Sequence, residues 1–134
     1  MREWLSRLRP RRPAPLTGAP PVRRRKSYSA RSGYVYLYQY EGYRQRGPEQ
    51  ATEYVFEISA DRKSVDYVSV LLAPSATAAW EDAHYRLGAN ERYAIAKMAL
   101  FQAFDERENP QLMRHAIIVR RADAESILDT LGLG

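Results

Sequence analysis

Residues 90–106 constrain the fold of this chain more than any other stretch, because they are too apolar for a helix on the surface. Asn90 can accept a backbone N–H bond at a helix start, and a helix ends before Pro110 because proline pushes the preceding residue out of the helical region. Side chains 100° apart separate a bulky face from a small one. The bulky face holds Tyr93, Met98, Leu100, Phe101 and Phe104, and the small face Ala96, Ala99 and Ala103. The pattern predicts a helix between a sheet and a second helix.

Three stretches with the alternation of β-strands precede this helix. They are residues 34–41, 52–59 and 65–72, separated by a loop at 42–51 and a polar turn at 60–64. In the second stretch Tyr54, Phe56 and Ile58 alternate with Glu53 and Glu57, which predicts one buried and one solvated face. Together the three stretches predict an antiparallel meander.

The remaining elements complete an α+β pattern. A helix is expected from Pro74 or Ser75 through Leu87, with Gly88 as its end. Residues 114–121 predict a fourth strand because three β-branched residues disfavour a helix, although a helix from Gln111 is the alternative. Asp123 is expected to cap a last short helix. The order βββααβα predicts a two-layer sandwich, an antiparallel four-stranded sheet with helices on one face.

The charge of the chain is divided unevenly along its length. Residues 1–27 hold nine basic residues against one acidic residue, a net charge of +8, whereas residues 28–134 hold twelve against fifteen, a net charge of −3. Five of the eight prolines also lie in residues 1–32. Arginine and proline at this density favour disordered or polyproline-like backbone. We therefore expect a basic, disordered arm over residues 1–32 and a single α+β domain over residues 33–134.

The basic arm suggests a function in binding. Its cationic side chains can neutralise phosphates, and arginine's planar fork suits bidentate phosphate contacts. These candidate nucleic-acid-binding residues are Arg7, Arg9, Arg11, Arg12, Arg23, Arg24, Arg25 and Lys26. An acidic protein, an anionic membrane surface, or no specific role for the arm are the alternatives. In a further alternative, the acidic domain binds a protein partner and the arm only tethers it.

A row of tyrosines is the second candidate surface. The side chains of Tyr34, Tyr36, Tyr38 and Tyr40 share one face of the first predicted strand. Exposed, they could stack on unpaired bases; buried, they would form core with their hydroxyls at its rim. The core interpretation is favoured, because helices this apolar need a large sheet face to cover, and the nearer charges are glutamates.

No pattern in the sequence indicates catalysis. Lys97 falls within the aromatic face of the predicted helix, where its ammonium is expected to extend to the edge, with a catalytic base as the alternative. His84 and His115 lie on different elements, so neither a metal site nor a cofactor is expected. We predict a non-catalytic binding protein.

Composition excludes several classes of protein. The chain has no cysteine, which rules out disulfides and zinc–thiolate sites and favours a reducing, cytoplasmic setting. No window of 18 apolar residues predicts a membrane span. An organellar presequence is an alternative reading of the arginine-rich N-terminus, but Pro10, Pro13 and Pro15 would break the helix it needs.

Overall fold

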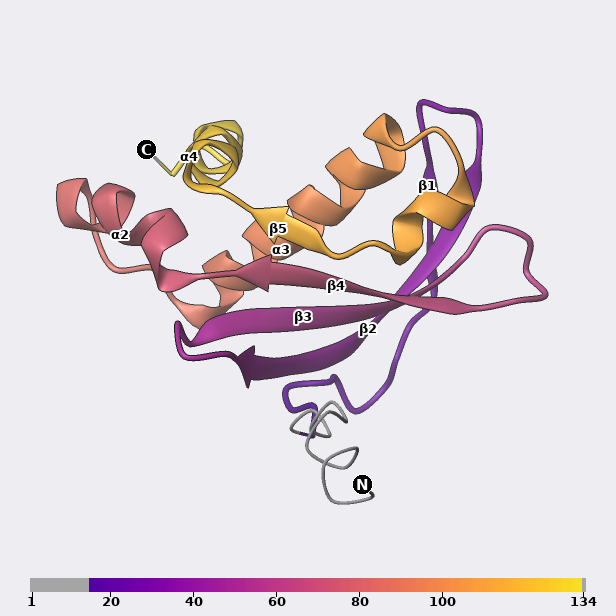
Figure 1. The fold of residues 1–134 in the computed structure, drawn as a ribbon, viewed down its shortest axis with the longest axis horizontal. Helices are drawn as coiled ribbons and strands as arrows, with labels where there is room; N and C mark the ends of the chain where they lie inside the picture. Colours follow the sequence, from indigo (N-terminus) through magenta and orange to yellow (C-terminus); the bar gives the residue numbers. More distant parts are fainter. Residues whose placement is uncertain (1–14, 134) are drawn as a thin grey trace, which may run out of the picture.

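The computed structural model describes residues 15–133 and has the α+β fold predicted from the sequence. A curled sheet lies beside three helices, with α3 crossing it (Figure 1). The elements, in chain order, are β1 (Lys26–Ser29), β2 (Val35–Arg46), β3 (Ala51–Ser59), β4 (Asp66–Leu72), α2 (Pro74–Ala83), α3 (Ala89–Glu106), the 3-10 helix η1 (Pro110–Arg114), β5 (Ile117–Val119) and α4 (Arg121–Thr130).

The sheet is mixed and has five strands, which corrects the prediction of four antiparallel strands. Its order is β1-β2-β3-β4-β5, and the expected meander forms β2, β3 and β4. The last strand, β5, pairs parallel to β4, with Val70 opposite Ile117. A parallel neighbour needs a long crossover, and here α2, α3 and η1 supply it.

β2 is longer than the sequence predicted. A loop was predicted at 42–51, but the strand continues through a bulge at Gly42 and ends at Arg46. Gly42 has a φ of 120°, which glycine adopts more readily than a residue with a side chain. The turn begins only at Gly47, whose carbonyl accepts the N–H of Gln50 at 3.2 Å. The bulge shifts the alternation by one residue, so that Tyr43, opposite Tyr54, lies on the same face as Tyr40.

Residues 26–29, which the sequence analysis assigned to the disordered arm, form strand β1. They pair with β2, with Tyr28 opposite Tyr36. The Tyr28 ring stacks on Phe101 of α3 at 4.5 Å between centroids, and its hydroxyl donates to Asp105 at 2.7 Å. These long-range contacts order a segment whose own composition favours disorder.

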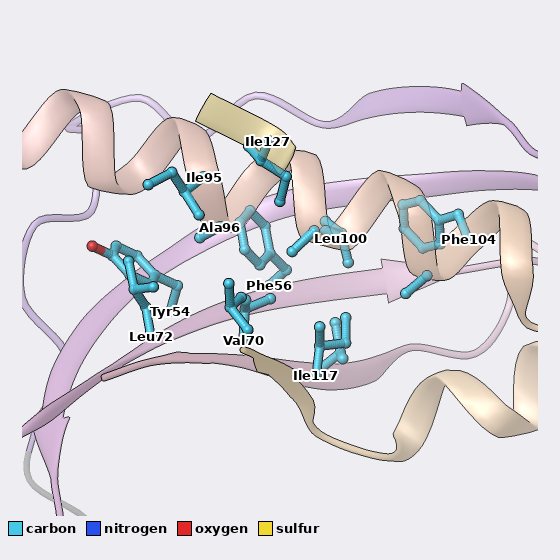
Figure 2. Packing of buried hydrophobic residues seen from close by; sticks show 14 of the residues in the cluster. Tyr54, Phe56, Val70, Leu72, Ile95, Ala96, Leu100, Phe104, Ile117 and Ile127 are labelled. Atoms are coloured by element: carbon cyan, nitrogen blue, oxygen red, sulfur yellow. The ribbon is translucent and has the colours of Figure 1, made fainter. Parts of the chain in front are cut away.

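The buried side of the central helix differs from the predicted division into a bulky and a small face. Ile95, Leu100 and Phe104 are buried together with three alanines, whereas Tyr93, Met98 and Phe101 are only partly buried. Ala96, Ala99 and Ala103 are buried, and α3 contacts both the sheet and α4. Figure 2 shows α3 side chains against Phe56, Val70 and Ile117 of the sheet. The helix begins at Ala89 rather than Asn90, because Glu91 accepts the N–H of Gly88 at 2.9 Å and so caps the first turn.

Several other boundaries differ from the expected ones. α2 ends at Ala83, so Leu87 is buried in the connection to α3 rather than in the helix. The fourth predicted strand is reduced to β5, because residues from Pro110 form η1. The last helix begins at Arg121, and Asp123 caps it from within the first turn, because its carboxylate accepts the N–H of Arg120 at 3.1 Å.

The tyrosine row belongs mostly to the core, which agrees with the interpretation favoured from the sequence. Tyr36 is fully buried and stacks on Phe104 at 4.3 Å, and Tyr38 is also buried. Tyr40 is partly buried against Tyr93, whereas Tyr34 is 42% exposed. These four tyrosines therefore do not form an open platform on which bases could stack.

The opposite face of β3 is less solvated than predicted. Glu53 is only 3% exposed. Arg44 and Arg46 each donate to its Oε1 at 2.9 Å, and the Ser69 hydroxyl donates to Oε2. A buried carboxylate is tolerated here because cross-strand neighbours pair with it.

Candidate functional site

A cavity forms where the N-terminal segment leaves the edge of the sheet. We call residues 17–26 the strap. At one end Thr17 and Tyr43 exchange two backbone hydrogen bonds of 2.9 and 2.8 Å, and at the other Lys26 pairs with Tyr38 in the β1–β2 ladder. In Figure 1 this indigo segment runs from beside β2 up to β1. Between its two anchors the strap forms one wall of the cavity.

The cavity is large enough for a small ligand. Its volume is about 750 Å³, within the range of ligand-binding pockets. β2 and β3 form its floor, the strap one wall and the first turns of α3 another. Five tyrosines line it: Tyr38, Tyr40, Tyr43, Tyr54 and Tyr93. Among the described residues that line the cavity, none is acidic.

The lining tyrosines form a contiguous aromatic surface. The ring centroids of Tyr40 and Tyr93 are 4.7 Å apart, and those of Tyr43 and Tyr54 are 6.2 Å apart. Tyr54 also lies 6.5 Å from Tyr40, which joins the two pairs. Such a surface buries apolar area and offers ring faces for stacking.

The hydroxyls of these five tyrosines have no hydrogen-bond partner among residues 15–133. Burial raises the pKa of Tyr40 above its usual range, and Tyr54, Tyr93 and Tyr43 raise it further. Burial also raises the pKa of Tyr38 and of Tyr93. The hydroxyls of Tyr38, Tyr40 and Tyr93 therefore keep their protons at neutral pH and can donate to a ligand.

The basic cluster at residues 23–26 is divided by the alternation of the strap. The even-numbered residues of the strap line the cavity: Gly18, Pro20, Val22, Arg24 and Lys26. The two odd-numbered arginines pair with glutamates of the sheet instead. Arg23 Nη1 lies 3.0 Å from Glu41 Oε2, and Arg25 Nη2 lies 3.1 Å from Glu57 Oε1. Adjacent arginines of the strap therefore have different surroundings: Arg24 lines the cavity, whereas Arg23 and Arg25 pair with glutamates.

Positive charge gathers at the cavity, and none of its described lining residues carries a carboxylate. Lys97 of α3 lies over Tyr38, with Nζ 5.9 Å from the ring centroid. Burial of the Lys97 ammonium lowers its pKa, and the neighbouring charge of Lys26 lowers it further. Lys97 thus lies against aromatic rings, as expected, but beside a second cation. Two adjacent ammonium groups repel each other, so an anion bound between them would be stabilised.

Arg92 provides a further cation, held by its own partner. Its Nη2 donates to Glu81 Oε1 at 3.0 Å, and Glu81 also accepts from Thr77 and from the N–H of Leu87. This network fixes the connection between α2 and α3 and places the guanidinium in the cavity wall.

The other candidate residues lie apart from the cavity. Arg7, Arg9, Arg11 and Arg12 are outside the described residues. His84 stacks on Trp80 at 4.3 Å, and its Nδ1 lies 2.9 Å from the Trp80 carbonyl oxygen.

Within residues 15–133, no three side chains of His, Cys, Asp or Glu lie close enough together to hold a metal ion. No described helix is long and apolar enough to cross a membrane.

Sequence reasoning missed several residues of the cavity. Tyr43 and Tyr54 come together only through the bulge at Gly42, and Arg92 and Tyr93 reach them only through the docking of α3. The one available signal in the sequence was that Arg24 and Lys26 are two residues apart. This spacing indicates a shared surface only once both residues are known to line the cavity.

Comparison of the chain with protein-family models, with curated proteins and with solved structures finds no match.

Proposed function

We propose that this chain is a small, non-catalytic binding or accessory protein whose basic N-terminal segment engages nucleic acid. The observation that carries the proposal is the position of Arg24 and Lys26, which line a cavity without an acidic lining residue among those described. Lys97 lies beside Lys26 and adds a third positive charge. A phosphate at this place would relieve the repulsion between cations.

Contacts to phosphate would dominate the affinity. Each cation that neutralises a phosphate releases condensed counterions, which gives binding that is strong at low salt and has little sequence specificity. By sequence, Arg7, Arg9, Arg11 and Arg12 add charge to the same end of the chain. Arg23 and Arg25 are half-exposed in their ion pairs, so a phosphate would compete there with a glutamate.

Binding of labelled single- and double-stranded RNA and DNA to the full-length chain over a salt series tests the proposal. Because β1 begins at Lys26, removing the N-terminal residues up to position 27 would delete half of a strand, so charge substitutions are the cleaner variants. Replacing Arg7, Arg9, Arg11 and Arg12 together by Gln should reduce the log–log salt slope on duplex DNA by up to about 4. Absence of binding to every nucleic acid at low salt would rule the proposal out.

A second candidate is a protein-interaction module in which the folded acidic domain binds the partner and the basic arm, residues 1–32, only tethers it. The observation that favours it is a pair of exposed apolar side chains, Tyr67 at 60% and Ile118 at 57%, on the sheet face that carries Glu57. Such a partner would be retained by the arginine-to-glutamine variants and lost when Tyr67 and Ile118 are replaced by Ser.

A further inference from the structure

We infer that the cavity between the strap, β2, β3 and α3 binds one nucleotide unit, a planar base joined to a phosphate. The inference deepens the proposed function and rests on it where the nucleotide belongs to a nucleic acid. Three independent properties of the cavity support it. They are an aromatic surface, a group of cations with no carboxylate among the described lining residues, and hydroxyl donors without a partner in residues 15–133.

The aromatic surface selects a flat, apolar ring. Tyr40, Tyr54 and Tyr93 lie within 6.5 Å of one another and are partly or fully buried, so their rings are held in place before a ligand arrives. Stacking of a base on an aromatic side chain is favourable for any base. A base inside a duplex already has both faces stacked, so the cavity would take an unpaired one.

The cations select an anion at the edge of this surface. Arg24 and Lys26 enter from the strap, and Lys97 approaches Lys26 from α3 across the ring of Tyr38. Arg92 lies on another wall, where Glu81 already holds one of its nitrogens. The phosphate is therefore expected near Lys26 and Lys97, with the base on the side of Tyr54 and Tyr93.

The polar groups of the cavity fit a ligand rich in acceptors. The tyrosine hydroxyls have no partner within residues 15–133 and can donate to ribose or phosphate oxygens. The amides of Gln45 and Asn90 also line the cavity and can both donate and accept, as the edge of a base requires. No carboxylate among the described lining residues would repel the phosphate.

Calorimetry and NMR with the full-length chain test the inference, with AMP, adenosine and ribose 5-phosphate as probes. AMP should bind at least about tenfold more tightly than either part alone, because it uses both the rings and the cations. NMR contacts should join the base protons of AMP to tyrosine ring protons. The double variant Arg24→Gln, Lys26→Gln should weaken AMP about tenfold or more and change adenosine little.

A matched control removes the same charge elsewhere. Arg62 and Lys63 are exposed in the turn between β3 and β4, at the end of β3 remote from Thr52, and neither lines the cavity. The described hydrogen bonds that these residues make use their backbone N–H groups, which substitution by Gln preserves. Arg62→Gln, Lys63→Gln should therefore leave AMP affinity unchanged. Equal weakening by the two double variants would overturn the inference in favour of a diffuse charge effect.

Competition distinguishes the two sources of the nucleotide. If the unit belongs to a nucleic acid, a single-stranded tetranucleotide should displace AMP more effectively than a duplex of the same length, because only the single strand offers an unpaired base as well as phosphates. If the ligand is a free nucleotide, AMP binds and the oligonucleotides do not, which supports the cavity and rejects the proposed function. Oligonucleotide binding that the Arg24→Gln, Lys26→Gln variant leaves intact, with no binding of AMP at about 1 mM, would reject the cavity and leave the proposed function standing.

Discussion

A β-carbon added to Gly42 would lie 2.6 Å from the carbonyl oxygen of Thr17, so the strap can dock on β2 because residue 42 has no side chain. The same glycine has φ of 120° and forms the bulge that places Tyr43 beside Tyr54. One residue thus both anchors the strap and completes the aromatic surface of the cavity. Its substitution should affect both.

Gly42→Ala should release the strap. The strained φ alone costs about 1–2 kcal/mol, and the contact with the Thr17 backbone should add about 1–3 kcal/mol. Chemical denaturation measures the loss of stability, and limited trypsin digestion at residues 23–26 should become faster. Gly33→Ala is the control, because Gly33 has φ of 100° but nothing within 4 Å of the added carbon. A similar loss of stability in the two variants, with no change in digestion, would contradict this role of Gly42.

The buried carboxylate of Glu53 should control stability in acid. Burial raises its pKa, but hydrogen bonds from Arg44 and Ser69 and the charges of Arg44 and Arg46 outweigh burial and hold the pKa at about 2, against an ordinary 4.5. The unfolded state therefore binds more protons between these values. The stabilisation, about 3 kcal/mol, is present above pH 4.5 and is lost as the pH falls towards 2.

Glu53→Gln should remove this pH dependence. At neutral pH the variant should be less stable by about 3 kcal/mol, and the two stability curves should converge as the pH approaches 2. Urea denaturation at a series of pH values gives both curves. Glu49→Gln, in the exposed turn after β2, should leave the acid limb of the curve as it is. A constant offset between wild type and Glu53→Gln down to pH 2 would show that Glu53 does not control the acid limb.

Tyr28 should hold β1 to α3 through both its ring and its hydroxyl. Tyr28→Phe keeps the stack on Phe101 but removes the donor to Asp105, which should lower stability by about 1–2 kcal/mol because the acceptor is charged. Thermal denaturation measures the effect. Tyr67→Phe, at an exposed position of β4, should be neutral. If both variants are neutral, the Tyr28–Asp105 bond contributes nothing measurable.

The sequence predicted those parts of the fold that depend on local periodicity. The burial of Tyr54, Phe56 and Ile58 on one face of β3 is written in consecutive residues and is confirmed. The expected solvated face of β3 and the expected division of α3 into a bulky and a small face are not confirmed. β1 is different, because its ordering depends on Phe101 and Asp105, which lie more than 70 residues away. Composition alone describes such a segment as disordered, since long-range contacts leave no periodic signal.

The same distinction explains what was missed at the cavity. Gly47 and Pro48 indicated a loop from residue 42, whereas the register of β2 with β3 shows a bulge at Gly42 and a strand that continues to Arg46. The arginine cluster was recognised as basic, but its division depends on the fold: Arg24 lines the cavity, whereas Arg23 pairs with Glu41 of β2 and Arg25 with Glu57 of β3. The sequence alone shows that the cluster is basic, whereas only the fold shows which of its side chains face the cavity.

Lys97 should be less favourable for stability than an apolar residue at the same place. In the folded protein its pKa lies below the ordinary 10.5, because of burial and then because of Lys26. Between the lowered pKa and 10.5 the unfolded state binds more protons, so this residue makes stability rise with pH in that window. Below the window the full penalty of the buried cation remains.

Lys97→Met should therefore stabilise the folded protein while weakening the binding of anions. Methionine keeps an unbranched apolar side chain, one atom shorter than lysine, against Phe101 and removes the repulsion of Lys26. This should raise the free energy of unfolding at neutral pH by about 0.5–1 kcal/mol. The rise of stability towards pH 10.5 should disappear from the urea series, and AMP affinity should fall severalfold. Lys63→Met, in the exposed β3–β4 turn, should change neither quantity. A loss of stability in Lys97→Met would show that the ammonium has a favourable partner in the free protein, and the cavity would then lack the unneutralised charge on which phosphate binding depends.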